Sequence, residues 1–362
     1  MKLFSFISCL LFLLMIAAAQ KTHKQKTAVI AYYAGDAQSV SVYPVEKLTH
    51  IIFSFCHLKG NELWVNNQKD TLTIQKLVSL KKRNPALKVI LSLGGWGGCE
   101  KCSEVFSTDE GRKEFAKSVK NLNVYFETDG IDLDWEYPAI EGFPGHTYKA
   151  EDKHNFTLLI ETLRKELGPA PEISFAAGGF TKFLAESIEW DKVTPMVNKI
   201  NLMTYDLING NSTVTGHHTA LYSTKEQLES TDHAVRYLDS IGVPKNKMII
   251  GAAFYGRIFD VNKDTLNGLY QTGKFNTGIS YSKLNKDSLQ NEGFSSFWDN
   301  TAKAPYMYCA AKKQFITFDD KRSIMLKTKY VLRNQLGGIM FWQLGEDKPV
   351  NGLLDAIDAA LH

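Results

Sequence analysis

The chain has 362 residues, of which 44% are hydrophobic and 22% are charged, and its formal net charge is +3. This length is enough for one large domain or two ordinary ones. The small net charge and the lack of a long basic run argue against a nucleic-acid partner, which would require a clustered basic patch.

The N-terminal segment predicts export. Lys2 is followed by an apolar run that ends in Ala17, Ala18 and Ala19. This layout is typical of a secretory signal peptide over residues 1–19. The alternative is a single-pass membrane anchor, for which the run is borderline in length. No later stretch is long and apolar enough to span a membrane, so we expect a secreted protein, extracellular or, in a Gram-negative bacterium, periplasmic.

Short apolar runs rich in β-branched residues recur along the chain and predict strands. Eight such runs occupy residues 27–33, 50–58, 88–95, 130–137, 172–179, 199–206, 248–256 and 337–345. Several intervening segments have helical spacing, such as Phe156, Leu159, Leu163 and Leu167 before Gly168. Eight alternating units predict an α/β fold, a closed (β/α)8 TIM barrel. An open doubly wound sheet is the alternative.

One interval interrupts this alternation. About eighty residues separate the last two predicted strands, too many for an ordinary loop. The part from 258 to 318 is rich in aromatic residues, Gly and Asn. We expect a small α+β insertion there, between strand 7 and helix 7. The TIM-barrel catalytic domain would then comprise residues 20–257 and 319–362.

Four cysteines follow the predicted signal peptide: Cys56, Cys99, Cys102 and Cys309. The CEKC segment at residues 99–102 would supply half of a zinc site, but a structural zinc ion needs four ligands and no second such pair is present. In an exported protein a disulfide is the expected use. The sequence leaves the pairing open, and we expect neither a metal nor a cofactor.

The segment DGIDLDWEYP alternates acids with apolar residues. The acids are Asp132, Asp134 and Glu136, and the apolar residues are Ile131, Leu133 and Trp135. Parallel barrel strands are buried on both faces. We therefore expect the apolar residues to face the helices and the acids to face the bore. Glu136 would lie nearest the carboxyl end of the strand, where the active sites of this architecture lie.

Catalysis explains this row of acids better than calcium binding does. A calcium loop beginning at Asp132 would need Gly and Glu where the sequence has Tyr137 and Phe143. Same-face neighbours on a strand are about 6.6 Å apart, and like charges at that distance out of water raise each other's pKa. Glu136 is therefore expected to keep a proton near neutral pH and to act as a general acid. Asp132 and Asp134 are expected to titrate as a coupled pair.

The same segment resembles the DxxDxDxE motif of glycoside hydrolase family 18, the chitinase family. The four motif positions are Asp129, Asp132, Asp134 and Glu136. Other segments resemble further motifs of the family: SLGG (92–95), MTYD (203–206), FYGR (254–257) and FW (341–342). The resemblance covers nearly the whole mature chain, and the long interval resembles the α+β insertion of one chitinase subfamily.

The resemblance implies a glycosidase that cleaves β-1,4-linked N-acetylglucosamine polymers, namely chitin and chito-oligosaccharides. It implies a retaining, substrate-assisted reaction, in which the acetamido oxygen of the substrate attacks the anomeric carbon. Glu136 would protonate the leaving oxygen and then activate water. Asp134 would hold the acetamido N–H, supported by Asp132, and Tyr205 would donate a hydrogen bond to the acetamido carbonyl.

The resemblance also implies a sugar-binding surface. Trp342 would form the floor of the cleavage subsite, because sugar rings stack on aromatic faces. The other implied sugar-binding residues are Met203, Asp206, Tyr32, Trp96, Arg257 and Phe53. For Phe53, core packing is an equal alternative. Gly94 and Gly95 are expected to let the backbone approach other groups closely.

Two other functions remain open. One is a chitin-binding lectin on the same fold, and the other is an endo-β-N-acetylglucosaminidase acting on N-glycans. Such lectins typically lose the acid at the position of Glu136, which this chain retains. The WEYP ending, Trp342 and the insertion favour chitin. We expect a monomer whose partner is the saccharide substrate.

Overall fold

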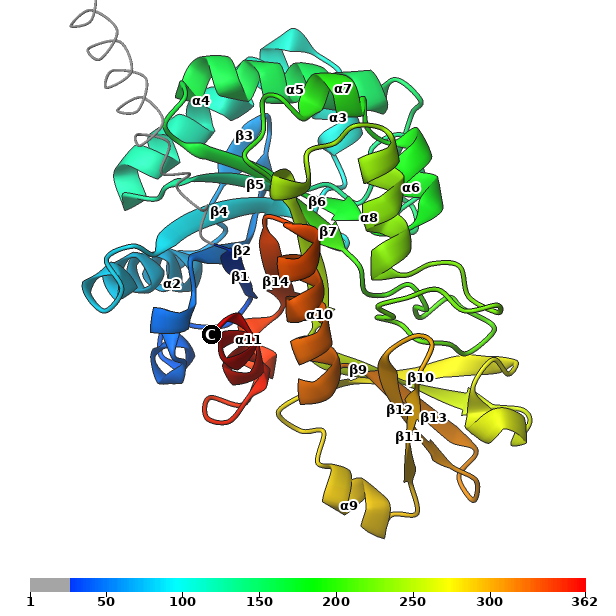
Figure 1. Ribbon diagram of the computed structural model, residues 1–362. Helices are drawn as coiled ribbons and strands as arrows, with labels where there is room; N and C mark the ends of the chain where they lie inside the picture. Colours follow the sequence, from blue (N-terminus) through cyan, green and yellow to red (C-terminus); the bar gives the residue numbers. More distant parts are fainter. Residues whose placement is uncertain (1–26) are drawn as a thin grey trace, which may run out of the picture.

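The computed structural model describes residues 27–362 (Figure 1). The predicted signal peptide lies outside the described residues. Within that part of the chain, no helix is both long and apolar enough to cross a membrane.

In residues 27–362, eight parallel strands form a closed barrel in the order β1-β14-β8-β7-β6-β5-β4-β2. They are β1 (Ala28–Tyr33), β2 (His50–Lys59), β4 (Lys88–Gly94), β5 (Gly130–Asp134), β6 (Glu172–Gly178), β7 (Lys199–Met203), β8 (Met248–Ala253) and β14 (Gly338–Trp342). The predicted TIM barrel is confirmed, and the open sheet is wrong, because β1 pairs with both β14 and β2. The short strand β3 (Glu62–Trp64), which pairs antiparallel with β2, was not predicted.

Helices lie between the barrel strands and around them (Figure 1). They are α2 (Gln68–Ser79), α3 (Cys102–Phe106), α4 (Asp109–Phe126), α5 (Asp152–Leu167), α6 (Thr181–Glu186), α7 (Trp190–Val193), α8 (Thr231–Ser240), α10 (Lys321–Asn334) and α11 (Leu353–Leu361). Helix α5 ends at Gly168, as its spacing predicted.

The alternation of side chains along the strands separates two layers of core. On β1, Val29, Ala31 and Tyr33 pack in the outer layer, between the strands and the helices. Ile30 and Tyr32 belong to a smaller cluster of side chains in the bore. Because successive strand residues point to opposite faces, one strand supplies both layers.

The long interval forms a second, antiparallel sheet in the order β10-β9-β13-β12-β11. Its elements are β9 (Tyr255–Val261), β10 (Gly273–Ser280), α9 (Lys286–Asn291), β11 (Ser295–Asp299), β12 (Ala304–Cys309) and β13 (Gln314–Phe318). Figure 1 shows these elements gathered beside the barrel, at the lower right of the view. The α+β insertion is therefore present. We propose residues 258–318 as its extent, although β9 begins three residues earlier, at Tyr255.

A buried ion pair joins the end of the insertion to the barrel. Lys327 of α10 and Asp319 are both fully buried, and the Nζ–Oδ2 distance is 2.6 Å. The same Asp319 oxygen accepts the backbone N–H of Ala253 at the end of β8, at 3.1 Å. Lys327 also donates to the Thr219 hydroxyl at 2.5 Å. This pair therefore connects α10, β8 and the loop after β7.

Replacing Lys327 by Met should leave the Asp319 carboxylate buried without its cation. Such a loss costs about 3–5 kcal/mol of the free energy of unfolding. Guanidinium denaturation followed by circular dichroism would measure it. The matched control is Lys329→Met at an exposed position of the same helix, which should change stability by no more than about 0.5 kcal/mol. Equal effects of the two substitutions would contradict the role given to the pair.

Candidate active site

Strand β5 presents its two faces as the alternation predicted. Its register sets Asp132 beside Ser92 of β4 and Ser174 of β6. The apolar residues of the row lie in the outer core: Ile131, Leu133 and Trp135. The acids therefore point into the bore.

Asp132 is fully buried, and its carboxylate accepts four hydrogen bonds. The donors are Tyr32 Oη (3.0 Å), Ser92 Oγ (2.9 Å), Ser174 Oγ (2.6 Å) and Asn201 Nδ2 (3.1 Å). Burial raises the pKa of Asp132, and these donors oppose the shift. Sequence reasoning missed three of the donors. A polar residue in the middle of an apolar strand is the signal that would have found each of them.

Tyr32 requires a correction. It was predicted to bind substrate, but it is only 1% exposed, and its hydroxyl donates to Asp132. Asn201 Nδ2 in turn donates to the Tyr32 hydroxyl at 3.1 Å. Tyr32 therefore supports the carboxylate from within the bore.

Asp134 is also buried, but its hydrogen bonding differs. Among residues 27–362, its Oδ1 atom has no hydrogen-bond partner. Burial raises the pKa of Asp134 well above its usual range, and the nearby charges of Glu136 and then Asp132 raise it further. Coupling to Asp132 was predicted, but Glu136 is the stronger electrostatic partner. The Oδ1 atom is left able to accept a hydrogen bond from a ligand.

Glu136 follows the last residue of β5 by two positions and lies half-buried at the carboxyl end of the barrel. Burial raises the pKa of Glu136 to about 7. A hydrogen bond from Tyr137 opposes this shift, and the charge of Asp206 adds to it. Glu136 therefore keeps its proton over part of the neutral range, the state that a general acid requires.

Asp206 follows β7 and forms an ion pair with Arg257 of β9. Arg257 donates from Nε and Nη2 to the two Asp206 oxygens, each at 2.5 Å. Burial raises the pKa of Asp206, but the neighbouring His218 and Arg257 outweigh burial and hold that pKa well below its ordinary value. Asp206 is therefore an ionised carboxylate, in contrast to Glu136.

Tyr205 and Met203, also from the β7 end, pack against the cluster of side chains in the bore. The Tyr205 hydroxyl lies 3.8 Å from Met340 Sδ. Burial raises the pKa of Tyr205 well above its usual range, and the charges of Asp134 and Glu136 raise it further. Tyr205 is therefore a neutral hydrogen-bond donor beside the two acids.

Trp342, the last residue of β14, stacks on Phe55. The ring centroids are 5.6 Å apart and the rings are 11° from parallel. The prediction that Phe53 binds sugar is wrong, because Phe53 is 2% exposed and belongs to the outer core. The pairing of β2 with β4 shifts register between Phe53 and Cys56. Alternation alone does not reveal such a shift, and sequence reasoning therefore missed Phe55.

Gly94 and Gly95 have the structural role that was predicted for them. Their φ angles are 108° and 80°. A Cβ on Gly94 would lie 2.2 Å from the Asp134 carbonyl oxygen, and one on Gly95 would lie 2.3 Å from the Phe55 ring. The absence of a side chain lets this loop lie against β5. The next residue, Trp96, is 54% exposed.

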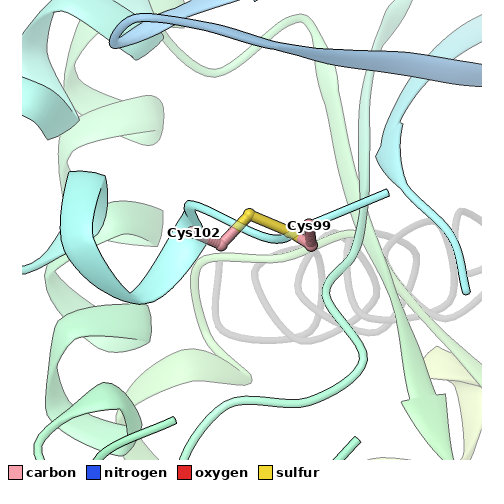
Figure 2. The surroundings of a disulfide bond; sticks show 2 residues. All are labelled: Cys99 and Cys102. Carbon is pink, nitrogen blue, oxygen red and sulfur yellow. A yellow bond between two sulfur atoms is a disulfide. The ribbon is translucent and has the colours of Figure 1, made fainter. Parts of the chain in front are cut away.

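The CEKC segment forms a disulfide between Cys99 and Cys102, at the start of α3 (Figure 2). Their Cα atoms are 5.2 Å apart. Cys56 and Cys309 are buried free thiols. Within the described residues, no group of three or more His, Cys, Asp or Glu side chains is arranged to hold a metal ion.

These side chains together permit a defined chemistry. A carboxyl group that keeps its proton lies beside a carboxyl with an unpartnered oxygen and a neutral phenol donor. An aromatic ring, stacked on a second one, lies at the same end of the barrel. Such a site can protonate a ligand oxygen, bind an amide through its N–H and carbonyl, and stack on an apolar ring face.

The chain is similar to known proteins over most of its length. The model of Glycosyl hydrolases family 18 matches residues 28–347. Chitinase A1 of Niallia circulans is 34% identical over 299 residues, which cover 76% of this chain and 43% of that protein. Chitinase B of Serratia marcescens is 29% identical, covering 92% of this chain and 81% of that protein. The chain thus spans less than half the length of the first relative.

Solved structures show the same fold. A family 18 N-acetylglucosaminidase from Paenibacillus barengoltzii superposes with a TM-score of 0.81 at 32% identity. The superposition covers 92% of this chain and all of that one (100%).

The raised pKa of Glu136 should appear in the stability of the protein. The folded protein holds this proton up to about pH 7, whereas the ordinary pKa is 4.5. Unfolding therefore releases the proton, and the free energy of unfolding should fall as pH rises between those values. Glu136→Gln lacks this group, so wild type should lose stability relative to the variant between pH 4.5 and about 7 in urea denaturation. Glu141→Gln, at an exposed position of the following loop, is the control. A pH-independent difference between wild type and Glu136→Gln would contradict the shift.

Proposed function

The chain belongs to glycosyl hydrolases family 18, and we propose that it is a secreted chitinase. Its substrates are chitin and chito-oligosaccharides, polymers of β-1,4-linked N-acetylglucosamine. The observation that carries this proposal is the pair of acids after β5. Glu136 has a pKa of about 7, and Asp134 beside it has an oxygen without a partner in the described residues.

Glu136 acts first as the general acid. It protonates the glycosidic oxygen as the bond to the anomeric carbon breaks. The acetamido oxygen of the substrate attacks that carbon from the opposite face and forms an oxazolinium ion. Glu136, now ionised, then removes a proton from the water that opens this ion. Two displacements at one carbon retain the β configuration.

Asp134 and Tyr205 hold the acetamido group. The unpartnered Oδ1 of Asp134 accepts the acetamido N–H, and the ionised Asp206 nearby supplies negative charge to the site. The neutral Tyr205 hydroxyl donates to the acetamido oxygen. Asp132, held by four donors, fixes Asp134 from below. This arrangement supports attack by the substrate itself, because no other carboxylate of the motif lies free beside the bond.

The remaining residues bind the sugar. Trp342, stacked on Phe55, is the floor on which the pyranose ring at the cleavage position lies. The ionised Asp206, paired with Arg257, accepts hydrogen bonds from sugar hydroxyls. Met203 supplies apolar surface that contacts the sugar. Trp96 stacks on the pyranose ring of a neighbouring sugar unit of the substrate.

Export rests on the N-terminal sequence, where Lys2 and the apolar run ending at Ala19 have the layout of a signal peptide. The lectin alternative would need no proton donor, and the retained acid at Glu136 argues against it. An assay that compares release of sugar from chitin oligomers and from a high-mannose glycopeptide separates the chitinase from an endo-β-N-acetylglucosaminidase.

Glu136→Gln should keep the fold and sugar binding but lower kcat by about 10²–10⁴-fold, the range for loss of a positioned acid–base group. Hydrolysis of chitin oligomers by the purified variant, with Glu141→Gln assayed in parallel, measures the loss. Near-normal hydrolysis by Glu136→Gln would remove this residue from the acid role.

The source of the nucleophile can be read from the product. Proton NMR of fresh product from chitin tetramer should show the β anomer before it mutarotates. Chitosan oligomers that place an unacetylated amine at the cleavage position should be cut at a negligible rate, because the nucleophile is missing. An initial α product, or rapid cleavage at a deacetylated residue, would rule out attack by the acetamido group.

A further inference from the structure

An aromatic rim lies beside the candidate active site, on the loops that follow β4 and β5. It consists of Trp96, Phe143 and His146. The Trp96 and Phe143 ring centroids are 5.5 Å apart, with the rings edge to face, and the Phe143 and His146 centroids are 4.8 Å apart. Trp96 is 54% exposed, and the other two residues are partly exposed. Phe143 and His146 belong to no part of the site described above.

The aromatic rim continues the floor of the site. Trp342 stacks on Phe55, and the Phe55 ring lies against the backbone of Gly95. Trp96 is the next residue, and its ring contacts Phe143. The adjacent residues Gly95 and Trp96 thus connect the stacked pair of Trp342 and Phe55 to the rim.

The loop that carries Phe143 is tied to the catalytic strand. The Phe143 N–H donates to the backbone carbonyl of Glu136 at 3.4 Å. Gly142 lies so close that a Cβ there would be 2.0 Å from the same oxygen. The His146 N–H donates to the Phe143 carbonyl at 3.0 Å. The backbone at Phe143 is therefore held against the backbone of the proposed acid.

The two loops of the rim are also fastened to each other. Buried Asp152 accepts from the Ser103 hydroxyl at 3.0 Å and from the Lys149 N–H at 2.8 Å. Ser103 is next in the sequence to Cys102, which forms the disulfide with Cys99 (Figure 2). A rim held in this way loses little conformational freedom when a ligand binds, which favours affinity.

We propose that Phe143 and His146 form an outer subsite that binds one further pyranose ring of the β-1,4-N-acetylglucosamine chain, beyond the ring on Trp96. The inference rests on the proposed function, because the occupant is the continuation of the same substrate. The Phe143 ring packs against the C–H face of the sugar, and a ring nitrogen of His146 hydrogen-bonds to a sugar hydroxyl. The subsite selects for longer chains.

The test compares chain lengths. kcat/KM is measured for chitin trimer through hexamer with wild type, Phe143→Ala, His146→Ala and Phe143→Trp. Aromatic stacking contributes about two- to tenfold, so Phe143→Ala should lower the hexamer-to-trimer ratio of kcat/KM by about that factor, and Phe143→Trp should restore it. Tyr125→Ala, a 70% exposed aromatic at the C-terminal end of α4, is the control and should leave the ratio unchanged.

The outcomes separate the alternatives. If Phe143→Ala lowers kcat/KM equally at all lengths, Phe143 only braces Trp96 and the outer subsite is wrong. An unchanged ratio also overturns it. If wild type cleaves no chitin oligomer, the chitinase proposal fails instead. Calorimetric titration with trimer and hexamer then still tests the subsite, which requires that Phe143→Ala weaken hexamer binding more than trimer binding.

Discussion

The carboxylate of Asp132 lies in the centre of the bore and joins five of the barrel strands. It extends from β5 and accepts hydrogen bonds from side chains of β1, β4, β6 and β7. A buried carboxylate is costly unless its oxygens are paired. A one-residue slip of any of these strands would turn its donor to the other face. The registers of the five strands are therefore mutually dependent. They also determine the positions of the residues that lie nearer the carboxyl ends of these strands than Asp132 does.

The same burial, with different partners, gives each acid of the site its own state. Asp132 is satisfied by donors, Asp134 lacks a partner for one oxygen, and Glu136 keeps its proton to about pH 7. Asp206 lies nearby, but His218 and Arg257 hold its pKa well below the ordinary value, so it is ionised. Four carboxyl groups of similar intrinsic acidity thus acquire different roles from their surroundings, as a site that must donate a proton and balance a positive charge requires.

Long-range contacts complete the site from outside β5. Arg257, at the start of the antiparallel sheet, reaches Asp206 at the end of β7. The buried pair of Lys327 and Asp319 fastens the exit of that sheet to the barrel. Strand β9 of the antiparallel sheet therefore contributes Arg257 to the site, and the buried ion pair directly after β13 connects the sheet to the barrel.

The sequence by itself determined the local features. The alternation of acids and apolar residues specified which face of β5 carries Asp132, Asp134 and Glu136, and the recurrence of strands and helices favoured a barrel over an open sheet. These inferences succeeded because a period of two is a property of the strand alone.

Only the tertiary structure decided which residues meet. Phe55 rather than Phe53 stacks beneath Trp342, because the pairing of β2 with β4 shifts register between them. Tyr32 turned out to support Asp132, a partner 100 residues away. Cys99 pairs with Cys102 although the sequence allowed other partners. A sequence specifies the chemistry and periodicity of each segment, whereas register, pairing and pKa arise from contacts between distant segments after they pack.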